Sequence, residues 1–224
     1  MAACIVQQGT HVMKKHYFLT LLFLLSATAA FAAEAPIEIA SIDKESVLQI
    51  RQPYSPPVII EKTEYYEIRG GSERELRNQM LQHGVTWEDG KRYDSLTSWY
   101  WTWDYGTGHT GQTCSADDFS ITLEIKLRLP KWVRTDEASQ SLVDKWEGYV
   151  KNLTLHENGH REMALDAAAH FAGAVARLPH ALNCADRDQR VRTLSHELMA
   201  QLNAAQQDYD VATDHGASQG ALFP

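Results

Sequence analysis

Leu155-His156-Glu157-Asn158-Gly159-His160 spells H-E-x-x-H inside a run whose apolar residues recur at helical spacing. Two histidines four residues apart lie on one face of a helix, where both imidazoles can reach one zinc ion. Glu157, beside the first histidine, is placed to take a proton from a water activated there. The stretch therefore predicts a zinc-binding helix with Glu157 as general base. The alternative interpretation is a solvated helix face that carries two histidines.

The motif is expected in the middle of a long helix, with a second helix after it. The helical pattern begins near Ser141 and reaches Leu178, where Pro179 closes it. A second apolar stripe at helical spacing covers roughly residues 186–208. The motif helix would therefore pack against a following helix.

The part of the chain before the motif predicts strands. Val58–Ile68 is rich in β-branched and aromatic residues, and residues 72–84 suit a short helix capped by its first serine. The aromatic segment Thr97–Tyr105 and the alternating segment Phe119–Leu129, ended by Pro130, are the other two strands. The order predicts an α+β domain: a small antiparallel or mixed sheet packed on helices, one of which carries the motif.

The N-terminus is typical of a secretory signal peptide. A basic pair after Met13 precedes the apolar run Tyr17–Leu25 and a small-residue end of A-x-A type, with cleavage expected after Ala32. An uncleaved membrane anchor is the alternative. We expect a signal peptide region at 1–32 that starts at Met13, an extended arm at 33–57 and the α+β domain at 58–224. The protein would be periplasmic or secreted, with no stable membrane anchor after cleavage.

The charge of the mature chain bears on its partners. Removing Lys14 and Lys15 from 21 basic residues leaves 19 against 29 acidic ones, a net charge near −10. Such a balance argues against nucleic acid as a partner.

Cysteine usage agrees with export. Beyond the leader the chain has only Cys114 and Cys184, which could close one disulfide in an oxidising compartment. Two free buried thiols are the alternative. Neither cysteine lies in a C-x-x-C pattern, which gives little support to redox catalysis.

A catalytic zinc usually has three protein ligands, so the two histidines need a third. Asp166 would lie about 9 Å along the helix from the second histidine and off its face, and His170 about 15 Å along. We favour His215, which a glycine follows in a loop of small and polar residues. Glu197 on the second helix and Asp210 are the rivals.

The chain resembles a bacterial family of secreted zinc-dependent proteases of the zincin type, whose activity is itself inferred. The resemblance covers most of the mature chain. It rests on Leu127-Arg128-Leu129-Pro130-Lys131-Trp132, on the H-E-x-x-H stretch, and on the tail from Tyr209-Asp210 to His215-Gly216 with Gln219-Gly220-Ala221. It implies a peptidase-like fold, so that the α+β domain at 58–224 would be zincin-like.

Together these features predict an exported zinc metallopeptidase acting on a peptide or protein. Zn²⁺ would be held by His156, His160 and His215, with Glu157 as base. Tyr209 is a candidate donor to the oxyanion, although a core aromatic is the more frequent role of such a residue. In zincins an edge strand pairs with the substrate backbone, and the segment 119–129 is the candidate here.

Two other functions stay open. The protein could bind zinc without hydrolysing anything, or it could be a metal-free envelope interaction module. In the second case the aromatic cluster Trp99–Trp103 would form the binding surface, although such clusters more often belong to a core. The sequence leaves the oligomeric state and the substrate specificity open.

Overall fold

A computed structural model describes residues 55–87, 90–105, 119–179 and 182–224. The expected signal peptide, the arm up to residue 54 and Cys114 lie outside the described residues. Within the described ranges, no helix has the length and apolar character needed to cross a membrane. Cys184 is disulfide-bonded, as expected for one member of the predicted pair.

A three-stranded mixed sheet forms one layer, in the order β1-β5-β4. β1 (Val58–Ile68) runs parallel to β5 (Phe119–Trp132), and β4 (Leu96–Tyr105) runs antiparallel to β5. This confirms the α+β class with a small mixed sheet. The prediction that the segment 119–129 is the edge strand that pairs with the substrate was wrong, because β5 lies in the centre of the sheet with a partner strand on both sides. In the part of the chain that the structure describes, β4 is the antiparallel edge strand.

β5 shows the alternation that its sequence predicts, with buried residues at every second position from Phe119 to Leu129. The prediction that Pro130 ends the strand was wrong, since β5 continues to Trp132. Pro130 lies beyond Arg128, the last residue that pairs with β4, so β5 has only β1 as a partner there. A missing N–H is tolerated where a strand has such an edge.

Among the described residues, three α-helices accompany the sheet. α1 (Glu73–His83) begins after Ser72, whose side chain accepts a hydrogen bond from the Glu75 N–H, as the capping pattern predicts. α2 (Gln140–Ala176) carries the motif, and α3 (Cys184–Thr213) extends five residues beyond the expected end. The short strands β2 (Val85–Thr86) and β3 (Arg92–Tyr93) form a hairpin, and a 3-10 turn, η2, covers Ala217–Gln219.

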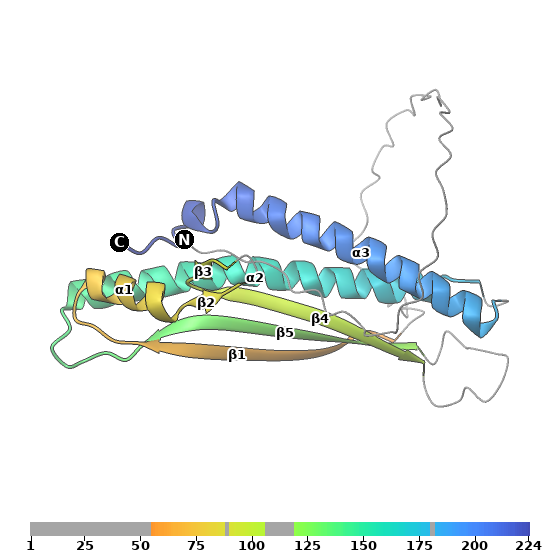
Figure 1. The fold of residues 1–224 in the computed structure, drawn as a ribbon, viewed down its shortest axis with the longest axis horizontal. Helices are drawn as coiled ribbons and strands as arrows, with labels where there is room; N and C mark the ends of the chain where they lie inside the picture. The colour runs from red at the N-terminus through yellow and green to blue at the C-terminus, as the bar shows by residue number, and fades with distance from the viewer. Residues whose placement is uncertain (1–54, 88–89, 106–118, 180–181) are drawn as a thin grey trace, which may run out of the picture. The chain divides into compact units, whose positions relative to one another are not determined.

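α2 lies between the sheet and α3, which returns along it in the opposite direction (Figure 1). The core fills the space between α2 and the inner face of the sheet. Trp99 and Trp101 are 1% and 4% exposed, and Trp101 stacks on Phe171 of α2 with ring centroids 5.4 Å apart. These two tryptophans belong to the core, whereas Tyr100 between them is 40% exposed and Trp103 is partly buried.

Candidate metal centre

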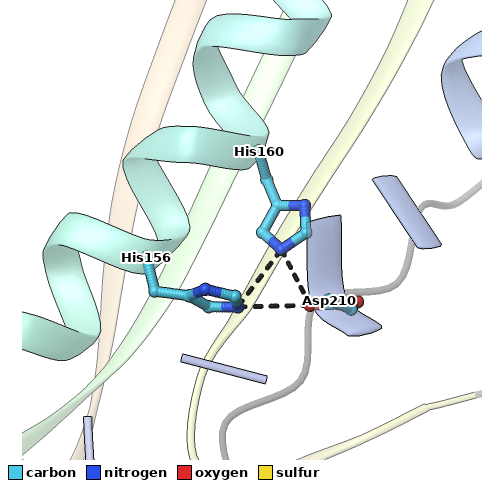
Figure 2. Close-up of side chains that lie close together, drawn as sticks. All are labelled: His156, His160 and Asp210. Atoms are coloured by element: carbon cyan, nitrogen blue, oxygen red, sulfur yellow. Dashed lines mark hydrogen bonds and ion pairs between the residues drawn. The ribbon is translucent and has the colours of Figure 1, made fainter. Parts of the chain in front are cut away.

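Three buried side chains from α2 and α3 converge on one point (Figure 2). The Nε2 atoms of His156 and His160 lie 3.3 Å apart. Asp210 Oδ1 lies 3.2 Å from the first of these nitrogens and 3.1 Å from the second. Both histidines are fully buried and Asp210 is 4% exposed.

The spacing of these three atoms fits a tetrahedral zinc ion. Ligand atoms about 2.0–2.2 Å from such an ion lie about 3.3–3.6 Å from one another. The three separations of 3.1–3.3 Å are close to that range. Two imidazole nitrogens and a carboxylate oxygen are also a common donor set of catalytic zinc. The residues therefore fit the ion that the motif predicts.

Helix periodicity explains why these donors meet. His156 and His160 are one turn apart on α2, and on α3 the buried residues Gln206, Asp210 and Thr213 repeat at the same spacing. Because the two helices pack against each other, the two stripes face one another. The extension of α3 beyond residue 208 is what places Asp210 on a rigid turn.

The charges in the cluster stabilise one another. Burial lowers the pKa of His156, but its hydrogen bond to Asp210 and the negative charges of Glu157 and Asp210 outweigh burial, so the pKa is raised. Burial raises the pKa of Asp210, and hydrogen bonds from the two histidines outweigh that effect and lower it. The lowered pKa favours the ionised Asp210 carboxylate, which can pair with a positive charge, either a protonated imidazole or a metal ion.

Glu157 is fully buried on the side of α2 that faces the start of β4. Its Oε1 accepts a hydrogen bond from the Ser95 hydroxyl, and its Oε2 accepts one from Thr97 Oγ1 at 2.6 Å. Thr97 Oγ1 also lies 3.2 Å from the carbonyl oxygen of Glu157. The two hydroxyls fix the direction of the carboxylate beside the histidine pair. The roles of Ser95 and Thr97 were not predicted, because no sequence pattern indicates that the start of β4 lies beside the motif.

Tyr209 packs over the two histidines. Its ring stacks on His156 at 5.1 Å with an interplanar angle of 10° and meets His160 edge-on at 4.9 Å. Its hydroxyl lies 3.4 Å from the His156 carbonyl oxygen and accepts a hydrogen bond from Gln219 Nε2 at 3.0 Å. The Tyr209 hydroxyl thus contacts both α2 and Gln219 of η2.

Gly159 makes this packing possible. A Cβ at this position would lie 2.2 Å from the Tyr209 hydroxyl oxygen. The glycine inside the motif is therefore needed for the close approach of α3 to α2.

The other candidate ligands lie apart from the three-atom cluster. His215 Nδ1 is 3.7 Å from Asp210 Oδ1, and the His215 side chain is 43% exposed. That nitrogen is buried and lacks a hydrogen-bond partner within the described residues. The structure thus brings Asp210, the rival, between the histidines and leaves His215 at the margin. Glu197, Asp166 and His170 are exposed on the helices, away from the cluster.

Two glutamines behind the histidines were also missed. Gln206 Oε1 contacts His160 Nδ1, and Gln219 Oε1 lies 3.0 Å from His156 Nδ1. Gln206 precedes Asp210 by four residues, a spacing that could have revealed it once Asp210 was chosen. Gln219 reaches the site from η2, and only tertiary structure shows its role.

The fold and site define an α+β protein with an H-E-x-x-H helix and a His/His/Asp cluster. The family model described as "Bacterial protein of unknown function (DUF922)" matches residues 63–216, and the chain belongs to this family. The matched range contains the three clustered residues and Glu157. Comparisons with curated proteins and with solved structures gave no match.

Proposed function

We propose that this protein is an exported zinc metallopeptidase in which His156, His160 and Asp210 hold the ion. The observation that carries the proposal is the convergence of three zinc-type donors from two helices, next to a buried glutamate in the H-E-x-x-H position. The favoured third ligand is thereby moved from His215 to Asp210. The zincin-like character of the fold and the inferred protease activity of the resembling family are part of the same proposal.

When bound, zinc would supply Lewis-acid activation of water and of a substrate carbonyl. Glu157 then takes the proton of the attacking water on one carboxylate oxygen and passes it to the leaving amine. Each carboxylate oxygen accepts one hydrogen bond, from Ser95 or Thr97, and keeps a second lone pair that can accept from this water. The two hydroxyls would hold the carboxylate in position while the proton moves.

The substrate backbone would pair with β4. This strand has the free antiparallel edge among the described strands, and it begins at Leu96, between the two residues that hold Glu157. An extended peptide on such an edge gains main-chain hydrogen bonds whatever its sequence. The partner is therefore proposed to be a peptide or protein that meets the enzyme in the periplasm or outside the cell.

A second candidate function is zinc binding without hydrolysis. Full burial of both histidines, together with a buried Glu157 that is hydrogen-bonded to Ser95 and Thr97, favours a site that ties α2 to α3. In that case the metal would stabilise the fold, as structural zinc does.

Glu157→Gln separates the two functions. The amide keeps the size of the side chain but cannot accept a proton, so zinc should stay at one per chain while cleavage of a denatured, fluorescently labelled protein falls by about 10²–10⁴-fold. Wild-type protein that holds zinc and cleaves nothing would favour the second candidate. Wild-type protein that holds no zinc would contradict both and return the metal-free module as the explanation.

A further inference from the structure

Each histidine has a hydrogen-bond partner at Nδ1, in addition to the contact of its Nε2 with Asp210. Each Nδ1 faces the side-chain oxygen of a glutamine, Gln206 for His160 and Gln219 for His156. A neutral imidazole has one N–H and one lone pair, and either nitrogen can carry the hydrogen. Only the tautomer with hydrogen on Nδ1 presents Nε2 as a metal ligand.

The orientation of Gln206 follows from its other contact. Its Nε2 donates to the backbone carbonyl oxygen of His160 at 3.0 Å, and a carbonyl can only accept. The amide oxygen is therefore the atom that faces His160 Nδ1. Because this oxygen can only accept, Nδ1 must be the donor, which leaves Nε2 as the ring nitrogen that a metal can use. Gln206 is 1% exposed, so water offers no competing partner.

Gln219 is oriented by a longer relay. The Tyr209 hydroxyl lies 3.4 Å from both the His156 carbonyl oxygen and Gln219 Oε1, and it accepts a hydrogen bond from Gln219 Nε2 at the shorter distance of 3.0 Å. The amide oxygen of Gln219 is then free to accept from His156 Nδ1 at 3.0 Å. The relay begins and ends on the same histidine. Asn152 of α2 supports it by donating to the Gly220 carbonyl oxygen at 3.1 Å, which holds the tail against the helix.

We propose that Gln206 and Gln219 are positioning residues that keep a hydrogen on Nδ1 of both histidines, with Tyr209 orienting the second glutamine. Both Nε2 atoms, which face Asp210 Oδ1, are then left for the metal, which would displace any proton that they share with the carboxylate. The inference rests on the proposed zinc function for its purpose. It gives Tyr209 a role in the hydrogen-bond network, in place of the oxyanion donor expected from sequence.

The tautomers can be read directly in the metal-free protein. Long-range ¹H–¹⁵N correlation spectra of histidine-labelled protein, recorded at a pH where the imidazoles are neutral, should show Nδ1–H for His156 and His160. A spectrum in which Nδ1 of either residue carries no hydrogen would overturn the proposal. This measurement uses wild-type protein and does not depend on the folding of any variant or on zinc binding.

Zinc affinity, measured by competition with a fluorescent chelator, gives the functional consequence. Gln206→Leu and Gln219→Leu should each weaken binding about 10–100-fold, the usual effect of losing the group that orients a metal histidine. Gln206→Glu and Gln219→Glu keep an acceptor and should recover most of the loss. Gln207→Leu, on the exposed neighbour of Gln206, is the matched control and should bind as wild type does.

The outcomes separate this inference from the proposed function. Wild-type protein that binds zinc, with leucine variants that bind it equally well, would overturn the role of the glutamines and leave the zinc site intact. Wild-type protein that binds no zinc would overturn the proposed function, while the tautomer spectra would still test the hydrogen-bond network.

Discussion

Replacing Gly159 by alanine tests the close contact of α2 and α3 at the metal centre. In an open helix position the change should stabilise the protein by up to about 1 kcal/mol, because alanine favours the helix. At Gly159 the new Cβ would lie 2.2 Å from the hydroxyl oxygen of Tyr209, 2.4 Å from Cζ and 2.8 Å from Cε1. The ring cannot turn aside freely, since it stacks on His156 and accepts a hydrogen bond from Gln219.

The two helices must therefore separate, at a cost of about 1–3 kcal/mol for overpacking. Gly148→Ala is the matched control, because Gly148 is exposed on the same helix and a Cβ there meets nothing within 4 Å. The Gly159 variant should unfold at a temperature lower than that of the control by roughly 2–12 °C. It should also bind zinc more weakly, since Tyr209 adjoins Asp210. Equal melting temperatures and equal zinc affinities in the two variants would refute the close approach.

Three further predictions concern the ligands, the metal and pH. Asp210→Ala should lower zinc affinity by more than roughly 100-fold, the upper limit for a residue that contacts a zinc ligand but not the zinc itself. His215→Ala should bind zinc within about 10-fold of wild type. Competition with a chelator measures both affinities, and the reverse order would make His215 the third ligand. Removing zinc with a chelator should lower stability by about 4 kcal/mol when zinc had been present at about 1,000 times its Kd, and an unchanged melting temperature would contradict a site that ties α2 to α3. Burial, with the charge and hydrogen bond of Asp94, raises the pKa of Tyr149 well above its usual value, so its stabilisation is complete below about pH 10 and is lost as pH rises further. Chemical denaturation from pH 9 to 11.5 should therefore show a shallower loss for Tyr149→Phe, with Tyr66, whose pKa burial also raises, accounting for what remains; identical slopes would show that Tyr149 has no such role.

Local patterns in the sequence were enough to predict most of the fold. Val58–Ile68 has the same limits as β1, and the alternation of the segment 119–129 marks β5. Ser72 and Gly84 bound α1 as capping residues do. These features depend on residues close together in the chain. The position of β5 in the centre of the sheet depends on pairing with strands far away, and no local pattern carries that information.

The metal centre also has a part that local sequence predicts and a part that depends on tertiary structure. His156, Glu157 and His160 lie within two adjacent turns of one helix, so their spacing in the sequence was sufficient to group them. The third donor depends on how α3 lies against α2 and on how far α3 extends. The sequence pattern predicted that α3 ends near residue 208. The third zinc ligand was therefore expected in the following loop, at His215. With α3 continuing to Thr213, Asp210 lies on the helix face that meets the histidines.

X-ray absorption at the zinc edge of the purified protein tests the central claim most directly. The account predicts one zinc per chain, with nitrogen and oxygen neighbours at about 2.0–2.2 Å and outer-shell scattering from two imidazoles. In Asp210→Ala the nearest shell should lose an oxygen, while in His215→Ala the spectrum should stay the same. Absence of bound zinc, or a nearest shell that changes with His215 and not with Asp210, would contradict it.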